Sequence, residues 1–246
     1  MLKFLLIIRS MLYPIIEGAD DNSSRVKKNI ADKYWQWFWH IEGKLETLEL
    51  GVEGSSIRGS ERAVLIETIL AGTKRPNILE VGIGYGQNLA ILSTVLPQQN
   101  LFGIDIDAER VTATQEYFKE HGLTNIEIKV ADAQSLPYED NVFDVVFSSA
   151  VFLYLSSEEA KQALKEMLRV SSSKKIVLLE QHLTSIEEVK LKVGVVEGDY
   201  YIRDYINLAS SIDPTLNVRE LNIPNPRWAV ENWKETSRVI VIEEGV

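Results

Sequence analysis

Residues 77–88, NILEVGIGYGQN, decide how the rest of this chain is interpreted. The first half of this stretch is apolar and typical of a buried strand, with the acid Glu80 two residues before the first glycine. Gly82, Gly84 and Gly86 follow at alternate positions, and then a helical pattern begins. Glycine has no Cβ, so a strand that ends in such a turn lets a ligand approach the backbone closely. The stretch therefore predicts a strand, a ligand-binding turn and a helix.

Short apolar strands alternate with helices along the chain that follows. The predicted strands are 77–82, 100–105, 125–130, 142–148 and 174–180, and the predicted helices between them are 87–96, 108–121 and 157–170. Strands that are apolar on both faces are typical of parallel sheets covered by helices. This order predicts an α/β fold with a doubly wound, mostly parallel sheet.

The last quarter of the chain has a different pattern. We predict a helix over residues 200–211, and strands over 216–223 and 237–242. The two strands have no helix between them, and strands joined in this way pair in an antiparallel manner. They therefore predict an antiparallel hairpin at one edge of the sheet.

The composition is that of an ordinary globular domain. The chain has 246 residues, of which 45% are hydrophobic and 25% are charged. A net charge of -10 argues against nucleic acid as the main partner, although a local basic patch would be compatible with that total. Without cysteine there are no disulfides or thiolate metal sites, and with only three histidines we predict no metal site.

The N-terminal quarter is predicted to stand apart from the alternating region. Residues 1–16 are apolar but interrupted by Arg9 and Pro14, which is too short for a membrane span. We expect no stable membrane insertion and a cytoplasmic protein, with peripheral membrane contact as the alternative. Residues 30–50 have a helical pattern with five aromatic side chains between positions 34 and 39. Five neighbouring aromatics cannot all face one core. We therefore expect residues 1–60 to form a helical extension that is pinned to the core, closes as a lid, or joins a homodimer.

Acidic residues at the ends of the predicted strands indicate the class of ligand. In an open parallel sheet the ligand lies at the carboxyl ends of the strands, beside the first one. Asp105 ends the second strand and could accept hydrogen bonds from two ribose hydroxyls, although Asp107 on the same turn is a rival. Asp132 follows the third strand and could meet an adenine amino group. Asp144 lies in an apolar strand and is expected to fix a neighbouring loop or helix end. The glycine spacing differs from that of nicotinamide cofactor binders, which remain the competing class.

Three motifs in this order resemble the class I S-adenosylmethionine-dependent methyltransferases, especially those that act on small molecules. They are Glu80-x-Gly-x-Gly-x-Gly, GIDID at 103–107, and ADAQSLPYEDNVFDVVFSSAVFLYL at 131–155. The resemblance covers roughly residues 78–180. It implies a Rossmann-like seven-stranded sheet whose last strand is inserted antiparallel, with helices on both faces. It also implies that residues 61–246 form the methyltransferase domain and that S-adenosyl-L-methionine is the cofactor.

The resemblance also assigns the residues around the methionine part of the cofactor. Glu80, Gly82, Gly84 and Gly86 would border it, and Ser148 or Ser149 would lie beneath it. The helix after Gly86 would turn its partially positive end toward the same region.

The adenosine part of the cofactor is assigned in the same way. Asp105 would bind the ribose hydroxyls, and Ile106 would pack on the adenine ring. Asp132 and Ala133 would contact the edge of the adenine.

The sequence also contains candidate residues for the acceptor side of the site. His182 follows the fifth strand and is a candidate base or substrate contact, the alternative being a structural loop histidine. Tyr154 stands where relatives often carry a histidine and is a second candidate catalytic residue. Arg203 and Tyr201 are candidate substrate contacts for a polar acceptor, the alternative being an amphipathic helix whose tyrosines pack on the sheet.

The sequence thus predicts a methyltransferase that moves a methyl group, by in-line displacement, to an oxygen or nitrogen of a small metabolite. A sugar or a natural-product intermediate is the expected type of acceptor. The alternatives are a protein or RNA methyltransferase and a non-catalytic protein that binds S-adenosylmethionine.

Overall fold

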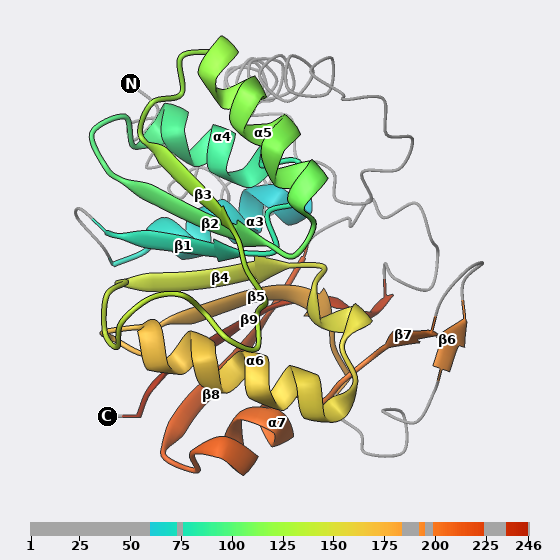
Figure 1. Ribbon diagram of the computed structural model, residues 1–246. Coiled ribbons are helices and arrows are strands. Elements are labelled where there is room, and N and C mark those ends of the chain that lie inside the picture. Colours follow the sequence, from blue (N-terminus) through green and yellow to red (C-terminus); the bar gives the residue numbers. More distant parts are fainter. Residues whose placement is uncertain (1–59, 73–75, 184–191, 195–198, 224–234, 246) are drawn as a thin grey trace, which may run out of the picture. The chain divides into compact units, whose positions relative to one another are not determined.

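A computed structural model describes residues 60–72, 76–183, 192–194, 199–223 and 235–245 (Figure 1). The chain divides into two compact units, residues 1–53 and 54–246, and everything described belongs to the second. The predicted N-terminal extension and its aromatic stretch lie outside the described residues, apart from Ser60 at the start of helix α3.

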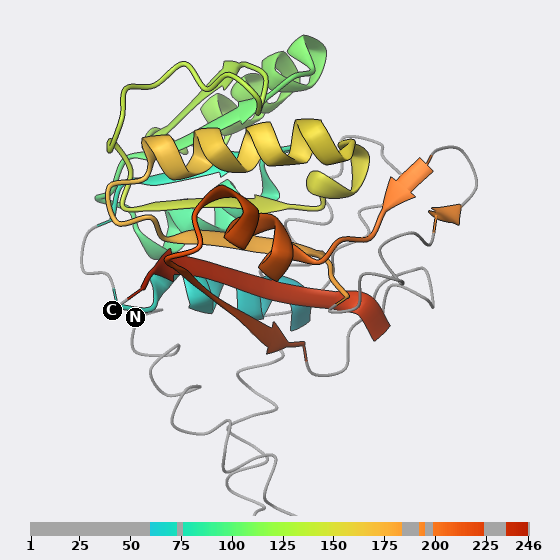
Figure 2. The same cartoon turned by 90° about the horizontal axis from the view of Figure 1, so that it is seen from below.

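A seven-stranded sheet with the order β3-β2-β1-β4-β5-β9-β8 forms the centre of this unit. The strands are β1 Ile78–Val81, β2 Leu101–Asp105, β3 Ile126–Val130, β4 Val145–Ser149, β5 Ile176–Gln181, β8 Leu216–Asn222 and β9 Ser237–Glu244. The first five are parallel, whereas β9 pairs antiparallel with both β5 and β8. The predicted fold, including the inserted antiparallel last strand, is confirmed, and Figure 2 shows the β8–β9 hairpin at the edge.

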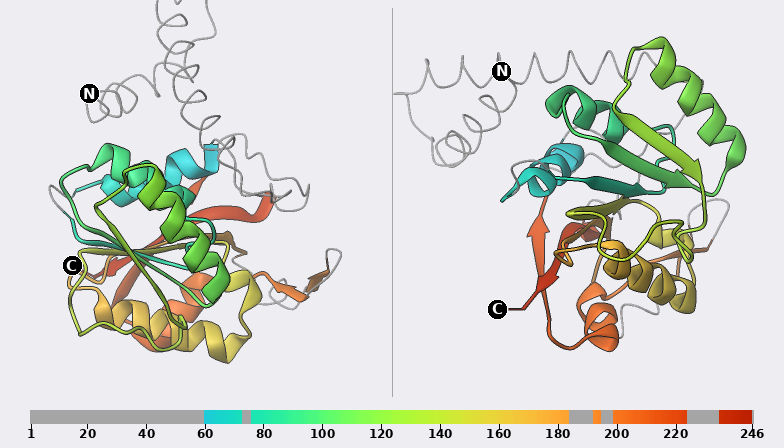
Figure 3. Two further views of the ribbon diagram at one scale, coloured as in Figure 1. Left: turned by 45° about the horizontal axis from the view of Figure 1, so that its top comes forward. Right: turned by 60° about the vertical axis from the view of Figure 1, so that its left-hand side comes forward.

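Helices cover both faces of the sheet. They are α3 Ser60–Leu70, α4 Gln87–Val95 and α5 Ala108–Glu120 on one face, and α6 Ser157–Val170 and α7 Tyr205–Ile212 on the other (Figure 3). Strands β1, β4 and β5 are buried at every residue, as parallel strands between two helical layers should be. No helix within the described ranges is long and apolar enough to cross a membrane.

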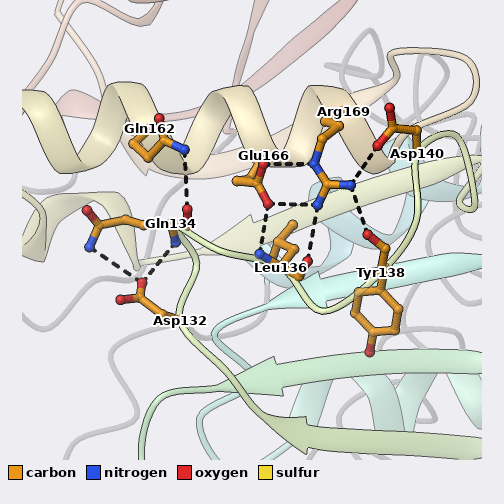
Figure 4. A network of polar contacts seen from close by, with 8 residues as sticks. All are labelled: Asp132, Gln134, Leu136, Tyr138, Asp140, Gln162, Glu166 and Arg169. Carbon is orange, nitrogen blue, oxygen red and sulfur yellow. Dashed lines mark hydrogen bonds and ion pairs between the residues drawn. The ribbon is translucent and has the colours of Figure 1, made fainter.

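The connection between β3 and β4, residues 131–144, contains no helix and is held by α6 instead. Arg169 of α6 donates hydrogen bonds to the carboxylates of Glu166 and Asp140 and to the carbonyls of Leu136 and Tyr138. Glu166 in turn accepts from the backbone N–H of Leu136 at 2.9 Å. Figure 4 shows these charge-assisted contacts between helix and loop, which the sequence did not reveal.

Two predicted elements were partly wrong. Residues 200–211 are not one helix, because Asp199–Tyr201 form strand β7, paired with β6 at Lys192–Gly194, and helix α7 begins only at Tyr205. Asp204 caps this helix by accepting from the N–H of Asn207, and such a cap sets the helix start.

The fourth strand also begins three residues later than predicted. The carboxylate of Asp144 accepts the backbone N–H of Asn77 at 2.8 Å, just before β1. This contact confirms the expectation that Asp144 fixes a neighbouring segment.

Candidate active site

The glycine turn after β1 has the left-handed backbone that its composition predicts. Gly82 has φ 77° and Gly84 has φ 56°, values that side-chain-bearing residues rarely adopt. A Cβ on Gly82 would lie 2.3 Å from Val151 Cγ2. Position 82 therefore has to lack a side chain, because the loop that follows β4 packs directly against it. A Cβ on Gly84 would meet no atom within 4 Å. The backbone at Gly84 therefore faces open space, where a ligand can approach it.

Asp105 ties the end of β2 to this turn. It is 5% exposed, and its Oδ2 accepts the N–H of Gly84 at 2.9 Å while Oδ1 accepts the N–H of Asp107 at 3.0 Å. Each carboxylate oxygen retains a lone pair for a further donor such as a hydroxyl. Asp107 is engaged differently, because its Oδ1 caps helix α5 at the N–H groups of Glu109 and Arg110. The two rival carboxylates thus have different partners, and which of them binds the ribose stays a prediction.

Glu80 is buried beneath the turn with part of its hydrogen-bonding capacity unused. Its Oε1 accepts the side-chain amide of Asn88 at 2.7 Å, and the Asn88 oxygen accepts from Arg62 Nε at 3.1 Å. By hydrogen-bond geometry, Oε2 is buried without a partner in the described part of the chain. Burial raises the pKa of Glu80 to about 8, outweighing the lowering effects of Asn88 and Arg62. Sequence reasoning missed Arg62 and Asn88, because only the fold brings them to this carboxylate.

Two serine hydroxyls lie at the end of the neighbouring strand. Ser148 and Ser149 end β4, and Ser148 is paired in register with Val81 of β1. Both residues are buried, and neither Oγ has a hydrogen-bond partner within the described ranges. Buried polar atoms are nearly always hydrogen-bonded in folded proteins. Together with Glu80 Oε2 they leave unsatisfied polar atoms at the carboxyl ends of β1 and β4.

An apolar side chain and a carboxylate lie at the ends of β2 and β3. Ile106 is 72% exposed, which is unusual for a large aliphatic residue. Asp132 is half-buried, and its Oδ1 accepts the N–H of Gln134 at 2.8 Å. The adjacent Ala133 is half-buried as well. An exposed aliphatic surface beside polar groups suits a flat heteroaromatic ring.

These observations fit S-adenosylmethionine. The bare backbone at Gly84, the Asp105 carboxylate and the unsatisfied atoms of Glu80 and Ser148 offer an open approach and polar partners along one edge of the sheet. The structure brings the predicted cofactor residues to the carboxyl ends of adjacent strands, where ligands bind in open α/β sheets. Their individual contacts with the cofactor remain predictions.

Tyr154 lies in the short 3-10 helix η1, Phe152–Tyr154, which follows β4. Its side chain is 62% exposed, in contrast to its buried neighbours Phe152 and Leu153. It is therefore accessible on the turn that leaves the Ser148 end of β4. Its catalytic role remains a prediction.

His182 is 2% exposed, and both of its ring nitrogens face protein groups. Nδ1 lies 3.2 Å from the Tyr205 N–H and 3.2 Å from the Arg203 carbonyl, while Nε2 lies 3.5 Å from Glu220 Oε2 without hydrogen-bond geometry. Nδ1 can either accept from the Tyr205 N–H when it is unprotonated or donate to the Arg203 carbonyl when it carries the proton, and both uses hold the ring against the protein. Burial lowers the pKa of His182 despite Glu220 nearby. These contacts are structural, and the predicted role as a base is not tested by them.

Arg203 is 4% exposed and donates to backbone carbonyls of the η1 turn. Its Nη1 lies 2.6 Å from the Phe152 oxygen, and its Nη2 bonds the Leu155 oxygen. The ring of Tyr201, which is half-buried, lies 4.8 Å from the guanidinium carbon. The sequence indicated that this pair was unusual, but not that the guanidinium is directed at the protein's own backbone. Their contact with a substrate remains a prediction.

Within the described ranges no group of three or more His, Asp or Glu residues could hold a metal ion.

Comparison with known proteins places this site in a family. Residues 78–174 match the model of the methyltransferase domain. The chain is 26% identical over 164 residues to a tRNA (guanine-N(7)-)-methyltransferase of Yersinia pestis, covering 64% of each protein. It is 31% identical over 166 residues to ajmaline N-methyltransferase of Rauvolfia serpentina, covering 66% of this chain and 56% of the relative. The chain thus spans less than two thirds of the length of either relative.

Solved structures share the fold at low sequence identity. The [4+2]-cyclase SpnF has a TM-score of 0.59 at 18% identity, with 75% of this chain and 80% of that chain covered. A SAM-dependent methyltransferase from Aquifex aeolicus has a TM-score of 0.54 at 21% identity, with 83% of this chain and 98% of that chain covered. Magnesium protoporphyrin IX methyltransferase from Synechocystis PCC 6803, solved with bound SAM, has a TM-score of 0.55 at 13% identity, with 92% of this chain and 87% of that chain covered. The matching domain model, the shared sheet and the site at its carboxyl edge agree, and they identify residues 78–174 as part of an S-adenosylmethionine-dependent methyltransferase domain of class I, whose cofactor is S-adenosylmethionine.

Proposed function

We propose that this protein binds S-adenosylmethionine at the glycine turn and transfers its methyl group to an oxygen or nitrogen of a small metabolite, such as a sugar or natural-product intermediate. The observation that carries the proposal is Asp105, whose carboxylate is fixed by the Gly84 N–H beside an open backbone surface. This arrangement offers preformed acceptors for ribose hydroxyls at the place where the family binds its cofactor.

The chain's own contribution to the reaction is chiefly positioning. The cofactor supplies an activated methyl group whose leaving group is a neutral thioether. Asp105 orients the bound donor, the bare backbone at Gly84 allows its close approach, and the surrounding side chains hold the acceptor in line and exclude water.

The need for a base depends on the acceptor. An oxygen nucleophile benefits from a nearby base, whereas a neutral amine does not need one. Tyr154 is exposed beside the site, while both nitrogens of His182 face protein groups. Accessible bases are scarce among the described residues of the site, which is compatible with a nitrogen acceptor as well as with a readily ionised oxygen.

A small molecule is favoured over tRNA as the acceptor. The net charge of -10 disfavours binding of the RNA phosphate backbone, because such binding depends on lysines and arginines that neutralise the phosphates. One relative is named for an alkaloid N-methylation and another for tRNA methylation, so both acceptor classes enter the test.

Isothermal titration of the full chain with S-adenosylhomocysteine, with NADH as a control, tests the cofactor site. We expect heat only from the former. Asp105→Ala removes a buried charged acceptor and should weaken binding about tenfold or more. The matched control Asp107→Ser removes the rival carboxylate but keeps a helix cap, and should bind within about threefold of the parent. Absence of binding to the parent, or equal effects of both variants, contradicts the proposed site.

Transfer of a labelled methyl group identifies the acceptor class. The full chain is incubated with labelled S-adenosylmethionine and either a low-molecular-mass extract or bulk tRNA. Label in the small-molecule fraction supports the proposal, and label in tRNA replaces it with RNA methylation. Binding without transfer to either pool favours the non-catalytic alternative.

We further infer a cytoplasmic location and, through residues 30–50, a homodimer. Light scattering on the full chain measures its mass in solution, and a monomer at micromolar concentration would contradict the dimer.

A further inference from the structure

Two buried charged side chains hold the turn at residues 150–155 from opposite sides. Glu180 of β5 is fully buried, and its Oε1 accepts the N–H groups of Val151 at 2.8 Å and Phe152 at 3.0 Å. Arg203 donates to the carbonyls of Phe152 and Leu155. The carboxylate therefore binds the amide side of this turn and the guanidinium binds its carbonyl side.

This arrangement is costly in free energy. Burying a carboxylate and a guanidinium removes their hydration, and a buried charged cluster is often no more stable than an apolar one. Burial raises the pKa of Glu180 to about 7 despite its backbone hydrogen bonds and Arg203. Glu180 Oε2 and the Tyr205 hydroxyl lack hydrogen-bond geometry to any described partner. Apolar side chains could fill this space without that cost in free energy. A buried carboxylate and a buried guanidinium, in contrast, fix the positions of the backbone amides and carbonyls that they bind.

The turn that they hold borders the candidate active site. Val151 packs so closely against the glycine turn that its Cγ2 lies 2.3 Å from where a Gly82 Cβ would be. The same turn follows Ser149, the last residue of β4, and carries the exposed Tyr154. Any displacement of the turn would therefore shift one wall of the cofactor site.

Strand β7 adds a third contact to this cluster. The Tyr201 ring at its end lies 4.8 Å from the Arg203 guanidinium, a distance typical of a cation–π contact. The hairpin β6–β7 is thereby linked to the η1 turn through one arginine.

We propose that Glu180 and Arg203 are positioning residues that fix the 150–155 turn against the glycine turn, and so set the distance between methyl donor and acceptor. This inference rests on the proposed function. It differs from a direct role of Arg203 in binding an anionic acceptor, because the guanidinium is directed at backbone carbonyls.

Hydrogen exchange and ligand titration on the full chain test this role together. The variants are Arg203→Lys, which loses the planar two-nitrogen contact, and Glu180→Ala, which loses the acceptor. Glu180→Gln keeps one acceptor oxygen and serves as the conservative rescue. The matched control is Lys175→Met at the opposite end of β5, because Lys175 is also a buried cation that donates to carbonyls, at 2.6 Å from Ala71 O.

We expect exchange of the amides in 151–155 to rise about tenfold in Arg203→Lys and Glu180→Ala, as the loss of charged hydrogen bonds predicts. S-adenosylhomocysteine binding should weaken about three- to tenfold in the same variants, and Glu180→Gln should recover both properties in part. Lys175→Met should change neither the amide exchange of residues 151–155 nor the affinity for S-adenosylhomocysteine. If Arg203→Lys does not fold, Tyr201→Ala should produce a smaller effect in the same direction.

Unchanged exchange at 151–155 would overturn the proposal. Raised exchange with unchanged ligand affinity would also overturn it, because the pair would then be structural only. If the parent does not bind S-adenosylhomocysteine, the proposed function fails, while the exchange result still decides whether the pair holds the turn.

Discussion

The carboxylate of Asp105 accepts a hydrogen bond of 2.9 Å from the backbone N–H of Gly84, 21 residues earlier in the chain. This bond joins the end of β2 to the turn after β1 and holds both before any ligand arrives. A preformed acceptor loses less entropy on binding than one that must be ordered by the ligand. The same bond explains why the glycine turn and the second-strand acid act as one site.

Gly84→Ala should separate ligand binding from stability. The new Cβ meets no protein atom within 4 Å, so the variant should lose only the about 1–2 kcal/mol that a left-handed alanine costs. The Cβ would, however, occupy the open space in front of the turn and weaken S-adenosylhomocysteine binding by about tenfold or more. Gly122→Ala is the control, because Gly122 has φ 68° and no neighbour within 4 Å, yet lies just after α5. Equal binding by the two variants would contradict a ligand at Gly84.

Gly82→Ala should destabilise the fold itself. Its Cβ would lie 2.3 Å from Val151 Cγ2, and such overpacking costs about 1–3 kcal/mol in addition to backbone strain. Urea unfolding followed by circular dichroism measures the loss. Val151→Ala removes the clashing methyl, so the double variant should be less destabilised than the sum of the single ones. Strict additivity would contradict this direct contact.

Glu80 should make the ligand-free protein less stable as the pH rises from about 5 to 8. Burial raises the pKa of Glu80 from its model-compound value of 4.5 to about 8. The negative charge of Asp105 adds to this increase, whereas Asn88 and Arg62 lower the pKa without offsetting it. In this window the folded state holds a proton that the unfolded state releases, so this stabilisation is complete below pH 4.5 and is lost by about pH 8. The contribution amounts to at most about 1.4 kcal/mol per pH unit.

Glu80→Gln should therefore flatten the dependence of the urea midpoint on pH. Part of the slope should remain, because the pKa of Glu180 is also raised, to about 7. Glu116→Gln on the exposed face of α5 is the control and should keep the parent slope. An unchanged slope in Glu80→Gln would show that Glu80 is ionised throughout.

Arg169→Lys should loosen the connection between β3 and β4. Lysine cannot reproduce the forked contacts to Glu166 and Asp140 and to two backbone carbonyls, and the loss should cost about 1–3 kcal/mol. Urea unfolding of Arg219→Lys is the comparison, since Arg219 and Glu243 form an exposed pair at 3.6 Å that should contribute less than about 1 kcal/mol. Equal losses would mean that the Arg169 network contributes no more than a surface pair.

Local patterns identified most of the fold. Short apolar runs separated by glycine and helical segments placed β1, β2, β3 and β5 within about two residues of their observed starts and ends, because parallel strands between two helical layers must be apolar on both faces. The predicted helix over residues 200–211 is wrong at its start. Its tyrosines are compatible with a strand as well as with a helix, and residues 199–201 form a strand because they pair with β6.

The sequence was sufficient to identify the sheet, its glycine turn and the acids at the strand ends, because these depend on residue type and on spacing along one strand or turn. The partners of those groups depended on the fold. Arg62 of helix α3 reaches Glu80 through Asn88, and Glu180 and Arg203 both bind the backbone around the η1 turn. These residues are far apart in the chain and come together only when the helices and connecting segments pack on the sheet. Long-range contacts between side chains follow from the packing of whole elements, and a local pattern does not contain that information.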